Sequence, residues 1–162
     1  MGGEGIKTLN ERNSFYGMQH TCITSKNEFY FIGYYFKTVK GFIIYDGTYE
    51  KVQKDASPTI LIEAINNVLN SFRVGILQPE WKDLERIYKS NIKKFGFKTE
   101  KEFNRGAIHC GISLENEILE FLPSVNDGRG FAHRPKLIVA INSSEPVEKI
   151  YAALMEALSR CE

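Results

Sequence analysis

The first third of the chain alternates hydrophobic and polar residues in a pattern typical of β-strands. Turn signals divide residues 15–53 into short strands, at residues 25–27, 40–41 and 46–47. The last of these, Asp46-Gly47, is a preferred sequence for a two-residue hairpin turn. Residues 28–36 are hydrophobic on both strand faces, with Phe29, Phe31 and Tyr35 on one face and Tyr30, Ile32, Tyr34 and Phe36 on the other. The pattern predicts an antiparallel meander in which helices cover one face of this strand and something else meets the other.

Helical spacing replaces this alternation after residue 57. Ser57 and Pro58 form an N-cap and first-turn pair, and the helix that they begin should end before Gly75. Its hydrophobic stripe is Leu61, Ile65, Val68, Leu69 and Phe72. A second helix should run from Pro79 to Gly96, with the stripe Trp81, Leu84, Tyr88, Ile92 and Phe95. A capping-box pattern at residues 99–102 predicts a short helical turn after it.

Two-residue periodicity returns from Gly106 onward. Residues 106–114 should form a strand that buries Ile108, Cys110, Ile112 and Leu114, and residues 118–122 should form the next strand. The Gly-, Asn- and Pro-rich residues 123–135 read as a loop. Residues 136–142 are hydrophobic on both faces and should lie centrally in the sheet. A last helix follows Pro146, with the stripe Val147, Ile150, Tyr151, Leu154 and Leu158.

The order of these elements is strands, two or three helices, strands and a final helix. Segregated runs of this kind are typical of the α+β class. We therefore expect one domain over residues 1–162, with a mixed, largely antiparallel sheet packed by about three to four helices. Residues 1–12 are polar and should form a flexible segment before it.

Composition and cysteine content indicate the cellular compartment of the protein. Hydrophobic residues make up 43% and charged residues 25%, as in ordinary globular proteins. The odd number of cysteines, three, favours a reducing compartment over a disulfide framework. The polar start lacks the hydrophobic stretch of a signal peptide, and no run approaches the ~18 apolar residues of a membrane span. We expect a cytoplasmic protein that does not associate with membranes.

Candidate catalytic chemistry is sparse. No nucleotide-binding loop, dinucleotide fingerprint, zinc-protease or serine-hydrolase motif occurs in the sequence. One alternative is a small hydrolase or nuclease that uses Cys110 and His133 with Arg129. His20 and Cys22 alternate onto one strand face and supply at most half of a metal site. We expect no catalytic residues, no metal and no cofactor.

A second alternative is a nucleic-acid-binding module in residues 82–105. Residues 81–105 carry eight basic and four acidic residues, interleaved with Tyr88, Phe95, Phe97 and Phe103. Cations neutralise phosphates and aromatic rings stack on bases. The rings, however, follow the same helical stripe as Ile92, which favours burial in a core over nucleic-acid binding. We expect no direct contact with nucleic acid.

Aromatic residues supply the clearest signal for protein binding. Tyrosine is favoured at interfaces, because it combines a large rigid contact with a polar tip. A sheet covered on one side only would expose Tyr30, Tyr34, Tyr45 or Tyr49. The loop at residues 127–130 adds Asp127 and Arg129, and it reads either as a plain turn or as a binding loop.

Three segments together resemble the immunity proteins of bacterial contact-dependent growth inhibition (CDI) systems: EFYFIGYYFKTVKGFIIYDGTYEKV, PTILIEAINNVLNSF and KLIVAINSSEPVEKIYAALMEALSRC. The resemblance implies a cytoplasmic protein that forms a tight 1:1 complex with a cognate toxin domain, often a nuclease, and has no catalysis of its own. Because nucleases carry basic substrate grooves, acidic residues of the 106–162 portion, Glu115, Glu117, Glu120 and Asp127, offer a local complement. An exposed strand edge offers a second mode of binding, in which a toxin strand adds to the sheet.

Overall fold

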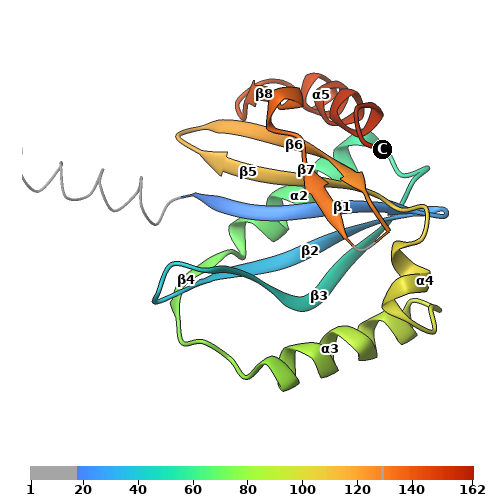
Figure 1. Cartoon of the computed structure of the whole chain (residues 1–162). Helices are drawn as coiled ribbons and strands as arrows, with labels where there is room; N and C mark the ends of the chain where they lie inside the picture. Colours follow the sequence, from blue (N-terminus) through green and yellow to red (C-terminus); the bar gives the residue numbers. More distant parts are fainter. Residues whose placement is uncertain (1–17, 129) are drawn as a thin grey trace, which may run out of the picture.

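The protein structure is a computed structural model that describes residues 18–128 and 130–162 (Figure 1). The strands are β1 (Gln19–Lys26), β2 (Phe29–Thr38), β3 (Ile43–Gln53), β4 (Arg73–Ile76), β5 (Ile108–Glu115), β6 (Ile118–Asn126), β7 (Phe131–His133) and β8 (Val139–Asn142). The helices are α2 (Pro58–Asn70), α3 (Trp81–Lys94), α4 (Glu100–Asn104) and α5 (Val147–Ser159), with a 3₁₀ turn at Pro135–Leu137. The expected flexible residues 1–12 and the candidate Arg129 lie outside the described residues.

The described strands form one sheet of eight strands with the order β3-β2-β1-β5-β6-β7. Adjacent strands along this order are antiparallel. β8 pairs with the first half of β6, beside β7, and β4 runs parallel to the end of β2. This arrangement confirms the predicted α+β class with a largely antiparallel sheet.

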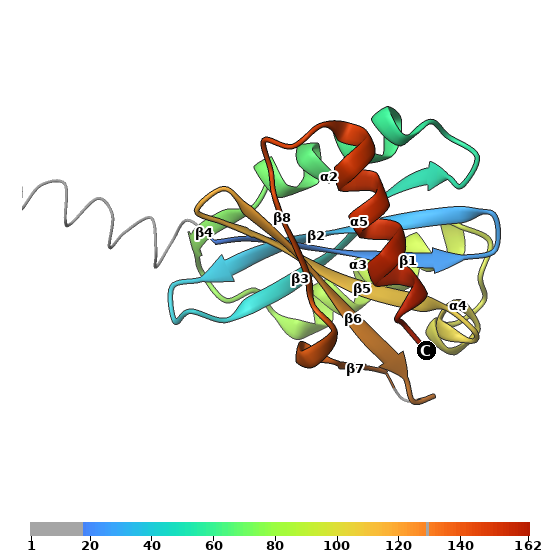
Figure 2. The same ribbon diagram turned by 90° about the horizontal axis from the view of Figure 1, so that it is seen from above.

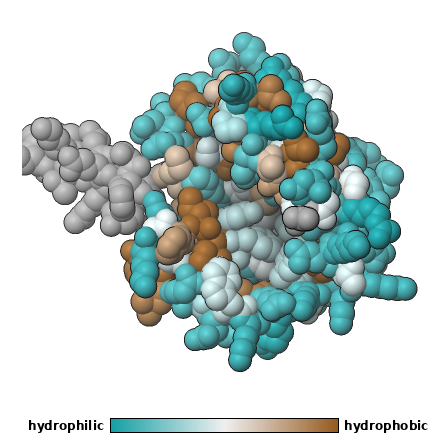
Figure 3. Space-filling model, viewed as in Figure 1, coloured by the Kyte–Doolittle hydropathy of each residue, from teal (hydrophilic) through white to brown (hydrophobic). Residues whose placement is uncertain are grey.

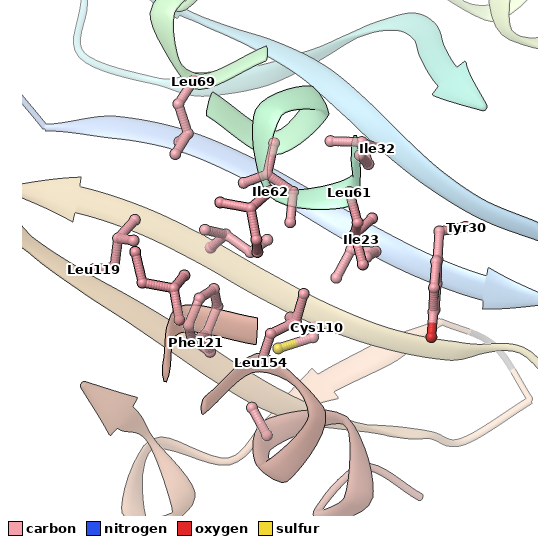
Figure 4. Close-up of a cluster of buried hydrophobic side chains, with 14 of the residues drawn as sticks. Ile23, Tyr30, Ile32, Leu61, Ile62, Leu69, Cys110, Leu119, Phe121 and Leu154 are labelled. Carbon is pink, nitrogen blue, oxygen red and sulfur yellow. The ribbon is translucent and has the colours of Figure 1, made fainter. Parts of the chain in front are cut away.

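Helices α2 and α5 cover one face of the sheet with an aliphatic core (Figure 2). The Ser57 side chain accepts a hydrogen bond from the Ile60 amide and starts α2 as the sequence predicts. The buried side chains include Ile23, Ile32, Leu61, Leu69, Cys110, Phe121 and Leu154 (Figure 4). We refer to this side as the aliphatic face.

Helices α3 and α4 pack on the opposite face; in Figure 1, α3 lies below β3 and α4 lies to the right of the sheet. Phe31 of β2 is buried there among phenyl rings from α4 and from the segment between the two helices, Phe95, Phe97 and Phe103. Thr99 caps α4, because its hydroxyl accepts a hydrogen bond from the Glu102 amide. We refer to this side as the aromatic face. The predicted division of residues 28–36 between two hydrophobic faces is therefore confirmed.

The expected hairpin turn at Asp46-Gly47 is wrong. β3 continues through both residues, and the register between β2 and β3 shifts there, which marks a bulge. Gly47 has a φ of 93°, and a Cβ at this position would lie 2.8 Å from Ile87 Cγ2 of α3. Asn91 of α3 also donates a hydrogen bond to the Gly47 carbonyl at 2.6 Å. The glycine therefore permits the close approach of α3, where the sequence pattern suggested a turn.

Two expectations for the C-terminal half also need correction. Residues 123–126 continue β6 and residues 131–133 form β7, so only part of the predicted loop is irregular. Residues 136–142 do not lie centrally: β8 covers only Val139–Asn142 and pairs with β6 alone among the described strands. Val139 and Ile141 pack against the aliphatic core, so β8 packs its apolar side chains on one face only.

Candidate partner-binding cleft

The aromatic face is only partly covered, and a cleft opens between α3 and β7. It comprises two adjoining cavities of about 660 and 270 Å³. Both cavities are lined by Cys22, Tyr35, Ile43 and His109, so they form one continuous hollow. Figure 3 looks onto this face and shows a pale hollow beside hydrophobic surface.

Small residues on three neighbouring strands form the floor of the cleft. Cys22 of β1 lies opposite Gly33 of β2 and also opposite Gly111 of β5. A Cβ on Gly33 would lie 3.1 Å from Cys22 Sγ, and one on Gly111 would lie 3.5 Å from the His133 ring. The two missing side chains therefore make the centre of the sheet surface concave.

Four tyrosines form the wall beside α3. The Tyr45 ring lies 5.6 Å from the Tyr35 ring, 4.9 Å from that of Tyr49 and 5.6 Å from that of Tyr88. Burial and the neighbouring Tyr49 raise the pKa of Tyr45, yet the two hydroxyls do not meet in hydrogen-bonding geometry. The buried Tyr45 hydroxyl thus has no hydrogen-bond partner among the described residues.

Two imidazoles and a phenyl ring form the opposite wall. The His109 ring stacks on Phe131 at 4.5 Å and lies 6.2 Å from the His133 ring. Thr24 lies 3.1 Å from His109 Nδ1, within hydrogen-bonding range. Burial, together with nearby His133, lowers the pKa of His109 to about 4. His109 is therefore uncharged at neutral pH.

Cys22, in the floor of the cleft, is not activated as a nucleophile. Burial raises the pKa of the Cys22 thiol to about 11, although Tyr35 donates a hydrogen bond to its sulfur at 3.2 Å. The thiol is accordingly protonated at neutral pH and is a poor nucleophile. His20, two residues away on the same strand face, has a buried Nε2 without a hydrogen-bond partner among the described residues.

Exposed hydrophobic side chains border one end of the cleft. They come from the β2–β3 connection with the start of β3, and from β4 through to the start of α3, and we call them the apolar rim: Val39, Phe42, Ile43, Val74, Leu77 and Trp81. The Val39 amide bonds the Ile76 carbonyl, which joins the first two of these segments. Ile43 and Trp81 also line the cleft, so the rim and the cleft are continuous. Contiguous exposed apolar surface of this kind commonly marks a protein interface.

The candidate binding residues do not all gather at this cleft. Tyr30 is buried in the aliphatic core (Figure 4), and Tyr34 packs at its margin with its hydroxyl 3.1 Å from Glu50. The expected exposure of Tyr30 is therefore wrong, because α2 and α5 cover that strand face. Glu117 lies in the β5–β6 turn, and Asp127 lies in the β6–β7 loop.

Tyr45, Tyr49 and Glu120 are the candidates that the structure places at the cleft. Sequence reasoning missed several further cleft residues, Thr24, Tyr35, Tyr88, His109 and Phe131. The alternation of His20, Cys22 and Thr24 against Thr21 and Ile23 was a usable signal, because it puts the polar set on one strand face. The alternation did not show that the helices on this side of the sheet would leave the face partly uncovered.

The proposed pairing of Cys110 with His133 is not formed. Cys110 faces the aliphatic core, whereas His133 lies over Gly111 on the aromatic face. Cys110 instead neighbours Cys161; their interaction raises the pKa of Cys110 and lowers that of Cys161. Within residues 18–128 and 130–162, no three His, Cys, Asp or Glu side chains are grouped as metal ligands.

The basic segment at residues 82–105 does not offer its rings to nucleic acid. Phe97 and Phe103 are buried, and Tyr88 and Phe95 pack against the same aromatic cluster. The outer side of α3 carries the charges, and four of them form two ion pairs: Lys89 with Glu85 at 2.8 Å and Arg86 with Asp83 at 3.4 Å. Base stacking on these aromatic residues would require the cluster to open.

Comparison with known families identifies the fold and its relatives. A family model described as "CdiI: CDI immunity protein" matches residues 19–161. The chain belongs to this CDI immunity family. The resemblance noted in the sequence is therefore confirmed, while a search of curated proteins finds no match.

Two solved structures share the fold of this CDI immunity family member. A protein of unknown function from Neisseria meningitidis is 18% identical with a TM-score of 0.78, over 90% of this chain and 96% of that chain. A chain from a CdiA-CT/CdiI toxin and immunity complex of Yersinia pseudotuberculosis is 16% identical with a TM-score of 0.75, over 90% and 98%. None of the described helices is both long and apolar enough to span a membrane.

Proposed function

We propose that this protein neutralises a cognate toxin domain, a nuclease, by forming a 1:1 complex with it in the bacterial cytoplasm, without catalysis of its own. The observation that carries the proposal is the family match over residues 19–161. The Yersinia pseudotuberculosis relative, which comes from a toxin and immunity complex, supports the same role. The separation of Cys110 from His133 on opposite sheet faces removes the main support for an enzyme.

The toxin-binding surface in this proposal is the cleft together with the apolar rim. Rigid aromatic side chains with polar tips are favoured at the centre of protein interfaces. Tyr45 and Tyr49 supply such side chains, and the unpartnered Tyr45 hydroxyl can bond a toxin group. The β6–β7 loop borders the cleft through Gly130, so Asp127 and its neighbours are also proposed to contact the toxin.

Co-expression with the toxin domain encoded beside this chain tests the proposal. We expect the tagged protein to retain the toxin domain through purification and to restore growth of cells that produce it. The mass of the complex by light scattering gives the stoichiometry, and the integrity of DNA and RNA in intoxicated cells reports nuclease activity. If neither co-purification nor growth protection occurs, the proposed function is wrong.

Strand addition is a second mode of contact within the same function. The outer edges of β3 and β8 pair with no other strand in the described part of the chain. A toxin that binds wild type and cleft variants equally well would direct attention to these edges. Proline substitution at Ala140 of β8 then tests whether the toxin needs the backbone hydrogen bonds of this strand.

A further inference from the structure

We propose that the cleft receives a cationic side chain, an arginine or lysine of the toxin domain, between its tyrosine wall and its carboxylates. This inference rests on the proposed function, because it names the chemistry that the toxin must present to the cleft.

The charged side chains among the described lining residues of the cleft are all carboxylates, although Lys37 lies close enough to His20 to help burial lower the pKa of that imidazole. The carboxylates are Glu85, Glu100 and Glu120, and none of the described lining residues is a lysine or arginine. The outer side of α3 is more basic, with Lys82, Arg86, Lys89 and Lys93 around a depression that shares only Glu85 with the cleft. A phosphate or an acidic segment would therefore be repelled at the cleft, whereas a cation would be attracted.

Two of the three carboxylates remain available for a partner. Glu85 forms an ion pair with Lys89 at 2.8 Å. Glu100 and Glu120 form no ion pair with any described residue. Glu100 does help to raise the pKa of Lys89, after the larger effect of Glu85. Glu100 also lies beside Tyr88, where it raises the pKa of that hydroxyl after the larger effect of burial.

Glu100 and Glu120 line different cavities of the continuous cleft. Glu100 belongs to the larger cavity beside α3 and α4, and Glu120 belongs to the smaller one beside His20 and Ser113. A toxin segment that follows the cleft can therefore place a cationic group at either carboxylate.

The tyrosine rings of the cleft wall can bind the cationic group of such a side chain. Arginine and lysine cations are attracted to the faces of aromatic rings within about 6 Å. Tyr45, Tyr49 and Tyr88 provide three rings in one cavity of about 660 Å³, which lies within the ~300–1,000 Å³ range of ligand pockets. The opposite wall adds no opposing charge, because burial keeps His109 neutral at physiological pH.

Binding measurements with paired variants test the inference. The variants are Glu100→Gln, Glu120→Gln and the double variant, and the probe is the toxin domain encoded beside this chain. Glu63→Gln is the matched control, because Glu63 is an exposed carboxylate of α2, the helix on the aliphatic face. We expect at least one single variant to weaken binding roughly tenfold, the double variant to be weakest, and the control to bind like wild type.

A second probe separates this inference from the proposed function. N-acetyl-arginine amide is titrated into the protein alone, with the uncharged citrulline analogue as its counterpart, and the tyrosine ring signals are followed by NMR. We expect concentration-dependent shifts of cleft tyrosines with the arginine compound only, and their loss in the double variant.

The outcomes distinguish the two ideas. A toxin domain that binds wild type and the double variant equally well overturns the cationic side chain but leaves the immunity function standing. Equal shifts with both small probes, or none with the arginine compound, also overturn it. If the toxin domain fails to bind the wild-type protein but the arginine compound still shifts the tyrosine signals, the proposed function is wrong and the preference of the cleft for cations stands.

Discussion

The two faces of the sheet differ in chemistry and in cover. The aliphatic face is closed by α2 and α5, and side chains such as Ile23 and Leu154 are fully buried there. The aromatic face is closed only where α3 and α4 meet Phe31, and elsewhere it exposes tyrosine, histidine and glycine. Aliphatic residues gain free energy from burial alone, whereas tyrosine and histidine also carry polar atoms that a partner can bond.

The same strands supply both faces at alternating positions. In β1, Ile23 points into the aliphatic core, while its neighbours Cys22 and Thr24 point into the cleft. The aliphatic face therefore maintains the fold, and the open aromatic face is available for recognition.

The largest effect on stability is expected from Leu154→Ala. The Leu154 side chain is fully buried on α5, so its truncation should lower the free energy of unfolding by about 2–5 kcal/mol. Urea denaturation followed by circular dichroism measures this change. The folded fraction should still bind the toxin domain with wild-type affinity, and a comparable loss of affinity would show that the two faces are not separable.

Acid should destabilise the protein through the cleft wall. The pKa of His109 is lowered to about 4, below its unfolded value of 6.5, so the unfolded state binds the proton first as the pH falls. This contribution is complete above pH 6.5 and is lost towards pH 4, and the loss amounts to about 2 kcal/mol by pH 5. Urea denaturation at pH 7.5 and 5 should show a smaller pH dependence in His109→Gln than in wild type. Identical pH dependence in both proteins would contradict the assignment.

The two floor glycines should respond differently to alanine. A Cβ at Gly33 meets three atoms at 3.1–3.3 Å, whereas the nearest contact of one at Gly111 is 3.5 Å. We expect Gly33→Ala to lower the free energy of unfolding by about 1–3 kcal/mol and Gly111→Ala to change it by less than about 1 kcal/mol. Thermal and urea unfolding of the two variants side by side provide the measurement, and the reverse order would refute this description of the floor.

A small effect is expected from Tyr45→Phe, and it should have opposite signs for stability and binding. Removing a buried hydroxyl that has no partner should stabilise the free protein by about 1 kcal/mol. The same change should weaken toxin binding up to about tenfold if the hydroxyl bonds the toxin. Unfolding and calorimetric binding measured on the same preparation test both signs; unchanged affinity would remove Tyr45 from the proposed contacts.

Local sequence signals predicted much of the fold. The cap at Ser57 and the two hydrophobic faces of residues 28–36 appear as expected, because each depends on neighbours close in sequence. The stripe after Ser57 is confirmed from Leu61 to Leu69, whereas Phe72 lies beyond the end of α2 and residues 73–76 form the unpredicted strand β4. Asp46-Gly47 and residues 136–142 were misread, since the approach of α3 and the position of β8 at the sheet edge are tertiary features.

The cleft was harder to predict than the fold. Its floor depends on Cys22 lying opposite Gly33 and Gly111, positions that are far apart in the sequence. Tyr30 and Tyr45 look equally suitable as exposed tyrosines in the sequence. Only the packing of α2 and α5 decides that the first is buried and the second lines the cleft.

The row formed by Gly33, Cys22 and Gly111 has a consequence for how such proteins diversify. Its members alternate along their strands with residues of the closed core, so a substitution in this row can reshape the hollow without touching Ile23 or Leu154. If the toxin binds the cleft as proposed, such substitutions would change recognition while the scaffold stays the same. At 16–18% identity, the solved relatives keep this scaffold.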